Sequence, residues 1–302
     1  MRILVLGRTG YLGAHVADRL RALPGARVFD GGRAPGADFG IDLAADHPDR
    51  LADVLAAAAP DAVVNCAGAT GGDAVTLAET NARGPAALCE ALRMAAPAAR
   101  LVHLGSAAEY GPGEPDTRVA ESAATRPVTP YGATKLAGTV AVTASGLDGV
   151  VLRVGNPVGP GAPPSGLPGR IAALLREAGP DPEAVLRLGD LSAHRDFVDV
   201  RDVARAVALA VTAPGPLPPV LNIGAGRAVP VRELVRGLAA RAGFRGRIEE
   251  EAAGSARSAQ VSWQCSDITA AGETLGWRPV HGLEDSLAAL WEAGAPEEVR
   301  TP

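Results

Sequence analysis

The chain has 302 residues, of which 47% are hydrophobic and 21% charged, and its formal net charge is -5. A chain of this size can bury a sizeable core in one large domain or two moderate ones, and its acidic balance disfavours a nucleic-acid partner. No charged leader precedes the first apolar run, and no apolar stretch reaches the roughly 18 residues that a bilayer requires, so we expect a soluble cytoplasmic protein without a membrane anchor.

The cysteines and histidines give no sign of a metal centre. Cys66, Cys89 and Cys265 are an odd number without CxxC spacing, which argues against a disulfide framework and against a structural zinc site. The five histidines are scattered, with no pair at helical spacing. We therefore expect three inert cysteines and no bound metal.

Short β-rich runs alternate with alanine-rich stretches from the start of the chain. This alternation predicts an α/β fold, in which helices cover both faces of a doubly wound parallel Rossmann sheet. Buried strands are expected at residues 3–6, 27–29, 62–65, 101–104 and 150–154. Crossover helices are expected at residues 14–22, 51–58, 75–95 and 131–145.

A glycine-rich loop connects the first predicted strand to the first predicted helix. The loop reads Gly7-Arg8-Thr9-Gly10-Tyr11-Leu12-Gly13. Its glycines let the backbone approach a ligand closely, and the helix N-terminus favours negative charge. We expect this loop to bind the pyrophosphate of a dinucleotide.

Charged residues near the second strand bear on the choice between NAD and NADP. Asp30 ends this strand, where a carboxylate accepts hydrogen bonds from the ribose hydroxyls and repels a 2′-phosphate, which favours NAD. Arg8 and Arg33 are cations that suit a 2′-phosphate, which favours NADP. The sequence leaves this choice open. Asp42 and Leu43 follow, and we expect them either to meet the adenine edge or to cap the next helix.

Tyr131 and Lys135 lie four residues apart at the start of a predicted helix, so both side chains project from one face. A phenol with an ordinary pKa of about 10 exchanges protons poorly at neutral pH, but a neighbouring ammonium stabilises the phenolate and lowers that pKa. Tyr131 is therefore a candidate general acid or base. Ser106 follows the strand at 101–104, at the carboxyl edge of the sheet where doubly wound folds bind ligands, so its hydroxyl is a candidate to polarise the same oxygen.

The composition changes after Val154. Residues 155–169 are dense in proline and glycine, which marks an excursion from the sheet. A strand at 197–200, a helix from 203 and a strand at 220–223 are expected to bring the chain back. We therefore predict a dinucleotide-binding domain at 1–154, with its sheet completed by about 196–224, and an interleaved substrate-binding lobe from 155–195 and 225–302.

Five motifs follow one another along the chain: the glycine loop, Asn65-Cys66-Ala67-Gly68, Thr80-Asn81-Ala82-Arg83-Gly84, Ser106-Ala107-Ala108-Glu109-Tyr110-Gly111 and Tyr131-Gly132-Ala133-Thr134-Lys135. Together they resemble the extended short-chain dehydrogenase/reductase family, also called the NAD-dependent epimerase/dehydratase family. The resemblance implies an enzyme dependent on NAD or NADP, in which Ser106 and Tyr131 bind the reacting oxygen and Lys135 also holds the nicotinamide ribose. It further implies cofactor contacts from Ala67, Gly68 and Asn81, although Asn81 is alternatively a structural cap.

The second half of the chain resembles the family's substrate-binding region. Asn156 looks like the asparagine that opens the substrate lobe and contacts a sugar nucleotide, and residues 189–203 resemble the corresponding segment of GDP-4-keto-6-deoxymannose reductases. This resemblance implies that Arg195 and Arg257 face the substrate pyrophosphate, for which planar guanidinium donors are suited. Trp263-Gln264 and residues 252–259 depart from the family's more charged segment. A homodimer through the helices at 75–95 and 131–145 is a further family expectation.

The residues after Ser106 bear on the reaction type. Family members that dehydrate nucleotide sugars carry an acidic residue just after the catalytic Ser or Thr, whereas this chain has Ala107 and Ala108 there. Glu109, on an expected strand-like path, points to the other side. We therefore expect reduction of a keto group of a nucleotide-linked 4-keto-6-deoxy sugar. The alternatives are an NAD-dependent epimerase, a ketoreductase for a non-sugar metabolite and, least favoured, a cofactor-sensing regulator.

Overall fold

The computed structural model describes residues 1–250 and 261–294. Its centre is a seven-stranded parallel sheet with the order β10-β6-β5-β4-β1-β2-β3. The order reverses between β1 and β4, and in open α/β sheets ligands bind at such a switch point, at the carboxyl ends of the strands. The strands are β1 (Arg2–Leu6), β2 (Arg27–Gly32), β3 (Phe39–Gly40), β4 (Ala62–Asn65), β5 (Arg100–Ser106), β6 (Gly149–Val154) and β10 (Val220–Ile223). The predicted fold class is confirmed.

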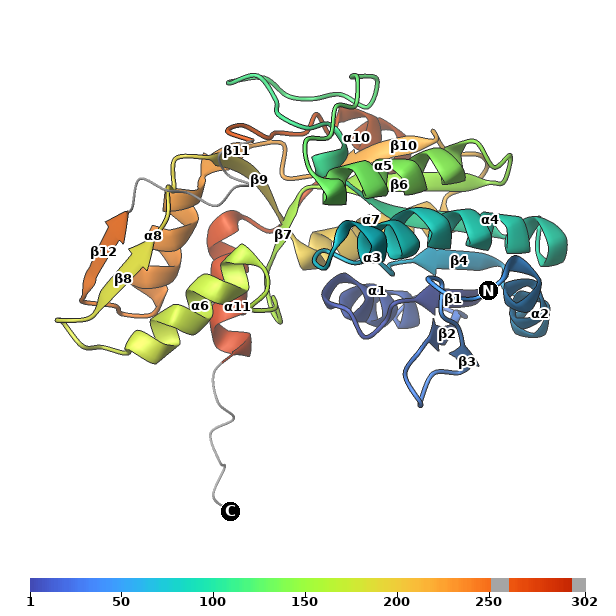
Figure 1. The fold of residues 1–302 in the computed structure, drawn as a ribbon, viewed down its shortest axis with the longest axis horizontal. Helices are drawn as coiled ribbons and strands as arrows, with labels where there is room; N and C mark the ends of the chain where they lie inside the picture. The colour runs from blue at the N-terminus through green and yellow to red at the C-terminus, as the bar shows by residue number, and fades with distance from the viewer. Residues whose placement is uncertain (251–260, 295–302) are drawn as a thin grey trace, which may run out of the picture.

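Helices cover both faces of this sheet (Figure 1). Alternate residues of β1 show the division, because Ile3 and Val5 pack in one apolar core and Leu4 and Leu6 in another. The first core lies against α1 (Tyr11–Arg21) and α7 (Val200–Thr212). The second lies against α2 (Pro48–Ala58), α4 (Gly84–Ala95) and α5 (Pro130–Thr143).

The stretch expected as one helix at 75–95 is divided. It consists of α3 (Ala74–Ala78), a π-helical turn η1 (Glu79–Arg83) and α4. Asn81, at the centre of η1, is buried and is hydrogen-bonded across to the loop that follows β4. A π-helical turn inside a helix often marks a functional position, and here it places this amide.

A smaller lobe packs at one end of the molecule, on the left in Figure 1. It holds a three-stranded sheet of order β11-β9-β7 and a two-stranded sheet of β12 and β8. Its elements are β7 (Asn156–Val158), α6 (Leu167–Ala178), β8 (Val185–Leu188), β9 (His194–Asp199), β11 (Ala228–Pro230), α8 (Val231–Arg241), β12 (Arg247–Glu250) and α11 (Leu283–Ala293). The strand expected to rejoin the large sheet at 197–200 is thus wrong in its pairing, because β9 pairs with β7 and β11 instead.

The chain returns to the large sheet near its C-terminus. The short helix α10 (Thr269–Leu275) packs beside β10 and α7, and the fully buried Trp277 donates a hydrogen bond from Nε1 to the carbonyl of Asp202 at 2.9 Å. The residues from 225 onward therefore serve both parts of the molecule rather than the lobe alone.

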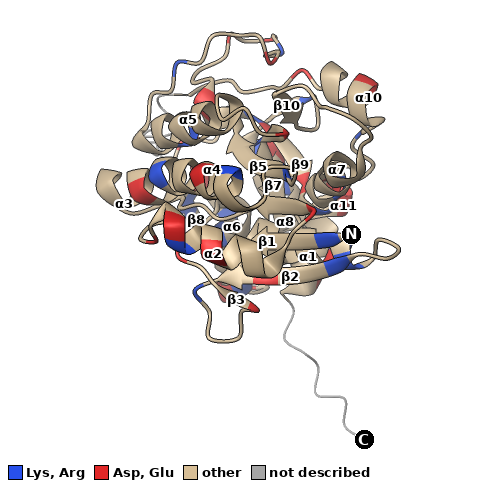
Figure 2. Cartoon of the chain, turned by 90° about the vertical axis from the view of Figure 1, so that its right-hand side faces the viewer, with Lys and Arg blue, Asp and Glu red and all other residues tan. Residues whose placement is uncertain are grey.

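The surface and the cysteines are those of an ordinary globular protein. Figure 2 shows acidic and basic residues interspersed along the helices and strands. Cys66, Cys89 and Cys265 are free thiols, and burial raises the pKa of Cys66 to about 12 and that of Cys89 to about 11. Among residues 1–250 and 261–294, no helix combines the length and apolarity needed to cross a membrane.

Candidate active site

The glycine loop between β1 and α1 is packed too tightly for side chains. Gly7 has φ +81°, and a Cβ there would lie 2.7 Å from the backbone nitrogen of Ala67. A Cβ at Gly13 would collide with the carbonyl of Gly7. The loop therefore lies directly on the segment that follows β4, at the switch point of the sheet.

This loop fits a dinucleotide pyrophosphate. Gly10 is the N-cap of α1 and no side chain caps the helix there, so its backbone N–H groups remain available as donors. Thr9 and Gly10 are exposed, while Leu12 packs on the core and anchors the helix. An anion placed here meets the positive end of the α1 dipole.

Asp30 and Arg8, which are expected to favour opposite cofactors, contact each other. Arg8 donates from Nε to Oδ2 of the buried Asp30 at 2.9 Å, and the carboxylate of Asp30 raises the pKa of Arg8. The carboxylate of Asp30 therefore holds the guanidinium of Arg8 at the end of β2. Arg33 is exposed between β2 and β3.

Asp42 and Leu43 occupy a turn before α2. The carboxylate of Asp42 accepts from the N–H of Ala44 at 3.0 Å, and Leu43 is buried. The expectation that Asp42 caps the next helix is wrong, because His47 is the N-cap of α2 and accepts from the N–H of Asp49. The adenine-edge role stays a prediction.

Asn81 joins the loop after β4 to α5. Its amide accepts from the N–H of Ala69 at 2.9 Å, donates to the carbonyl of Ala69 at 2.8 Å and donates to Oγ1 of Thr134 at 3.2 Å. A Cβ added at Gly68 would lie 3.9 Å from Nζ of Lys135. The structure therefore brings Gly68, Asn81 and Lys135 into one region.

The first turn of α5 carries Tyr131 and Lys135. Thr129 caps this helix by accepting from the N–H of Gly132 at 3.1 Å, and Pro130 fixes its first turn. A Cβ at Gly132 would lie 2.6 Å from the carbonyl oxygen of Ala108, so α5 presses against the segment just after Ser106. The half-buried Tyr131 thus starts its helix beside β5.

Lys135 is buried and donates from Nζ to the carbonyl of Leu104. Burial lowers the pKa of its ammonium to about 8, although Glu109 and Cys66 raise it in part. A charged group with a pKa near neutrality, one helical turn from a phenol, suits proton transfer at physiological pH.

Ser106 and Glu109 form a capping box on a 3-10 turn, η2 (Ala107–Glu109). The backbone N–H of Ser106 donates to Glu109 Oε1 at 2.8 Å, and Ser106 Oγ accepts from the N–H of Ala108 at 3.2 Å. The expected strand-like path after Ser106 is therefore wrong. Glu109 is fully buried, and its carboxylate also accepts from Thr139 Oγ1 at 2.9 Å and from Arg153 Nε at 2.7 Å.

Residues of the small lobe meet the same edge. Asn156 donates to the carbonyl of Asp196 at 3.5 Å and to Gln264 Oε1 at 3.3 Å, and Gln264 Nε2 donates to the carbonyl of Ala107 at 3.1 Å. Gln264 thereby links Asn156 to the residue next to Ser106. The sequence identifies Gln264 only as a departure from the family pattern and gives it no role.

The structure describes one of the two arginines expected to face the substrate. Arg195 is buried and donates from Nη1 to the carbonyl of His194 at 2.8 Å. Trp263 stacks on His194 with ring centroids 4.9 Å apart, next to this arginine. Arg257 lies outside the described residues.

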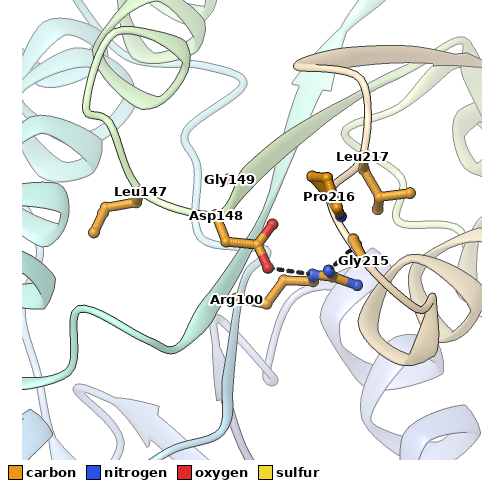
Figure 3. A pocket seen from close by; sticks show the side chains of 7 residues that line it. All are labelled: Arg100, Leu147, Asp148, Gly149, Gly215, Pro216 and Leu217. Atoms are coloured by element: carbon orange, nitrogen blue, oxygen red, sulfur yellow. Dashed lines mark hydrogen bonds and ion pairs between the residues drawn. The ribbon is translucent and has the colours of Figure 1, made fainter.

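A surface hollow of about 490 Å³ lies at the opposite edge of the large sheet (Figure 3). Its Arg100 pairs with Asp148 at 2.9 Å and donates to the carbonyls of Ala210, Ala213 and Gly215. This arginine clamps the start of β5 to the end of α7. The residues of the hollow therefore connect β5 to α7, and they lie at the other end of β5 from Ser106.

Comparisons with known proteins find one matching family and several similar chains. A model of the NAD dependent epimerase/dehydratase family matches residues 3–224. The chain is 40% identical over 304 residues to a dTDP-6-deoxy-L-talose 4-dehydrogenase (NAD(P)(+)) of Kitasatospora kifunensis, covering 97% of this chain and 95% of the relative. It is 33% identical over 232 residues to a UDP-glucose 4-epimerase of Streptomyces lividans, covering 71% and 68%. The structure of RMD from Pseudomonas aeruginosa complexed with NADPH has a TM-score of 0.82 and 25% identity, covering 97% of this chain and 98% of that one.

Proposed function

Because the chain belongs to the NAD-dependent epimerase/dehydratase family and is an NAD(P)-dependent enzyme that modifies nucleotide sugars, we propose that it reduces the 4-keto group of a dTDP-linked 6-deoxyhexose. The observation that carries this proposal is the arrangement around Ser106. The phenol of Tyr131 and the ammonium of Lys135 lie in the first turns of the adjoining helix α5. The positions after Ser106 that carry an acid in dehydrating family members are Ala107 and Ala108, and the nearby carboxylate of Glu109 is engaged by Ser106, Thr139 and Arg153. The talose 4-dehydrogenase supports both the C4 position and the dTDP group, since a dehydrogenation run in reverse is a keto reduction.

Tyr131, Lys135 and Ser106 have different roles in the proton transfer of the proposed reaction. A reduced nicotinamide, when bound, would supply the hydride that C4 receives. Tyr131 gives its phenolic proton to the carbonyl oxygen as the carbon–oxygen double bond becomes single, and the Lys135 ammonium stabilises the phenolate that is left. Ser106 Oγ accepts a hydrogen bond from the N–H of Ala108, and its O–H would donate to the same substrate oxygen.

The cofactor contacts are proposed from the same edge of the sheet. Gly7 to Gly13 would hold the pyrophosphate, and Asp30 with Arg8 would select at the adenosine ribose. Ala67, Gly68 and Asn81 would border the nicotinamide half. On the substrate side, Asn156 and Arg195 would meet the sugar nucleotide, and Arg257 is proposed for its diphosphate from sequence alone.

An epimerase is the second candidate, favoured by the similarity to the Streptomyces UDP-glucose 4-epimerase. Tyr131, with Lys135 beside it, would then take the proton of the C4 hydroxyl while a bound NAD would accept the hydride from C4. After the keto sugar rotates, the hydride would return to the opposite face of C4 and the proton to its oxygen. The two reactions differ in their balance, because a reductase consumes one reduced nicotinamide per product and an epimerase consumes none.

Transfer of deuterium from the reduced cofactor to the sugar distinguishes the reductase from the epimerase. The purified enzyme is incubated with a dTDP-4-keto-6-deoxyhexose and NADH or NADPH that carries deuterium at the transferable position. We expect stoichiometric loss of the reduced-cofactor absorbance and deuterium at C4 of the product sugar. Conversion of UDP-glucose to UDP-galactose without net cofactor consumption, and with no deuterium at C4, would support the epimerase instead. Retention of NAD through purification would point the same way.

A further inference from the structure

A layer of polar side chains lies between the large sheet and α5. Asn65 and His103 are register partners on the neighbouring parallel strands β4 and β5, so their side chains stand next to each other on one face. The residues two positions earlier, Val63 and Leu101, pack in the core beneath α4 and α5. His103 and Asn65 therefore point toward the same helices.

Three polar atoms in this layer are buried without a hydrogen-bond partner among the described residues. They are Nδ1 and Nε2 of His103 and Nδ2 of Asn65. The other amide atom of Asn65, Oδ1, accepts from the N–H of Ala67 at 3.0 Å, so Nδ2 faces the layer. An unsatisfied buried donor or acceptor costs about 1–3 kcal/mol, and native interiors meet such groups with ordered water.

Lys135 occupies the same layer. Its ammonium donates to the carbonyl of Leu104, the residue that follows His103. Burial and the charge of Lys135 hold the pKa of His103 well below its usual range, so the imidazole is neutral. A neutral imidazole offers one N–H donor and one lone pair, which suits a network that must receive a hydrogen bond from an ammonium.

We propose that His103 is a positioning residue for the reaction: with Asn65 it holds an ordered water beneath Lys135, and this network keeps the Lys135 ammonium protonated and directed toward Tyr131. The inference rests on the proposed function only in taking Lys135 as the partner of Tyr131. His103 acts through hydrogen bonding alone, because an imidazole that is already neutral adds no charge.

The other groups that face Lys135 carry the charge balance. Glu109 on η2 raises the pKa of the ammonium, and Arg153 on β6 is paired with that carboxylate. Cys66 lies at the end of β4 and remains a neutral thiol, since burial raises its pKa to about 12. From η1, the side chain that reaches this region is the neutral Asn81. Replacing His103 therefore changes the hydrogen bonding of Lys135 without changing any of these charges.

Lys135 is the single lysine of the sequence, which makes the test direct. Enzyme labelled with lysine that carries ¹³C only at Cε gives one lysine resonance, whose pH titration reports the pKa of Lys135 without substrate. H103F keeps a ring of similar size and removes the hydrogen bonds, H103Q keeps an acceptor and a donor, and L101A weakens packing on the same strand and face. H103L replaces H103F should the latter not fold.

We expect the parent resonance to titrate at about 8. In H103F it should titrate about one unit lower, a tenfold loss of proton affinity, while H103Q and L101A stay near the parent. The alkaline limb of kcat should move with it, and KM for the cofactor should not.

Overlapping titrations of folded H103F and parent enzyme would overturn the inference, and so would an equal shift in L101A, which would assign the effect to packing. If the parent turns over no nucleotide sugar but the lysine titration still shifts in H103F alone, the proposed function fails and the His103 network stands.

Discussion

The buried ion pair of Glu109 and Arg153 allows a quantitative prediction of a change in thermal stability. The side chain of Glu109 is 0% exposed and that of Arg153 6% exposed, and the two meet at 2.7 Å. The substitution Glu109→Gln keeps the size of the side chain but removes the charge, which leaves the guanidinium of Arg153 buried without a counter-ion. Arg153 also lies over the ring of Tyr110 at 4.5 Å and has little room to reach water.

The magnitude follows from the burial. Breaking a buried ion pair by removing one partner costs about 3–5 kcal/mol. Unfolding entropy of about 2.1 cal/mol/K per residue gives about 0.6 kcal/mol per kelvin for the 302-residue chain, so Tm should fall by about 5–8 °C. Adding Arg153→Met removes the unpaired charge and should restore part of this loss.

Thermal unfolding of the parent, E109Q, E109Q/R153M and the control E114Q measures the effect. Glu114 is exposed, so E114Q should change Tm by less than about 1 °C. A Tm for E109Q within that range would refute the structural role of Glu109. Loss of turnover in E109Q at unchanged Tm would show that Glu109 acts in the reaction, and a normal pH dependence of the residual kcat would exclude an effect through Lys135 and reopen the dehydratase interpretation.

Three further results are expected. Tyr131→Phe should lower kcat at least about 100-fold, the lower range for loss of general acid–base catalysis, while cofactor affinity by fluorescence titration stays within several-fold; unchanged turnover would remove Tyr131 from the mechanism. Because burial lowers the pKa of Lys135 to about 8, its ammonium is present below that pH and lost above it, so kcat for reduction should fall as pH rises through about 8, and a rate that stays constant to pH 10 would contradict this. Asp30→Ala releases Arg8 from its 2.9 Å contact and should raise the preference for NADPH over NADH about tenfold, or about 1.4 kcal/mol, in kcat/KM; an unchanged ratio would show that Asp30 does not select the cofactor.

The large sheet could be predicted from the sequence because its strands are apolar runs in a fixed βαβ order. The run at 62–65 is β4, and the run at 220–223 is β10. The sheet to which β9 belongs could not be predicted, because the residue pattern of His194–Asp199 does not distinguish one sheet from another. Its pairing with β7 and β11 depends on contacts distant in sequence, and local patterning does not encode them.

Some residues of the candidate site could be predicted from local sequence, and others could not. The glycine loop, Ser106, Tyr131 and Lys135 belong to local motifs, so the sequence alone predicts that they meet at one sheet edge. Strand periodicity does not describe Glu109, because its carboxylate caps Ser106 and the chain forms a 3-10 turn there. Gln264 lies 108 residues from Asn156, and no local signal connects the two. The available signal for His103 is a polar residue inside an apolar strand.

The return of the chain to the large sheet after the lobe has a practical consequence for fragments of this protein. A fragment ending at Val154 would contain the whole glycine loop and every motif residue through Lys135, yet it would lose β10 and α7. The strand β6, buried along nearly its whole length, would become an open edge, and the apolar side chains beneath α7 would face water. Open apolar edges template aggregation, so the cofactor-binding half should not be obtainable as a stable free-standing module.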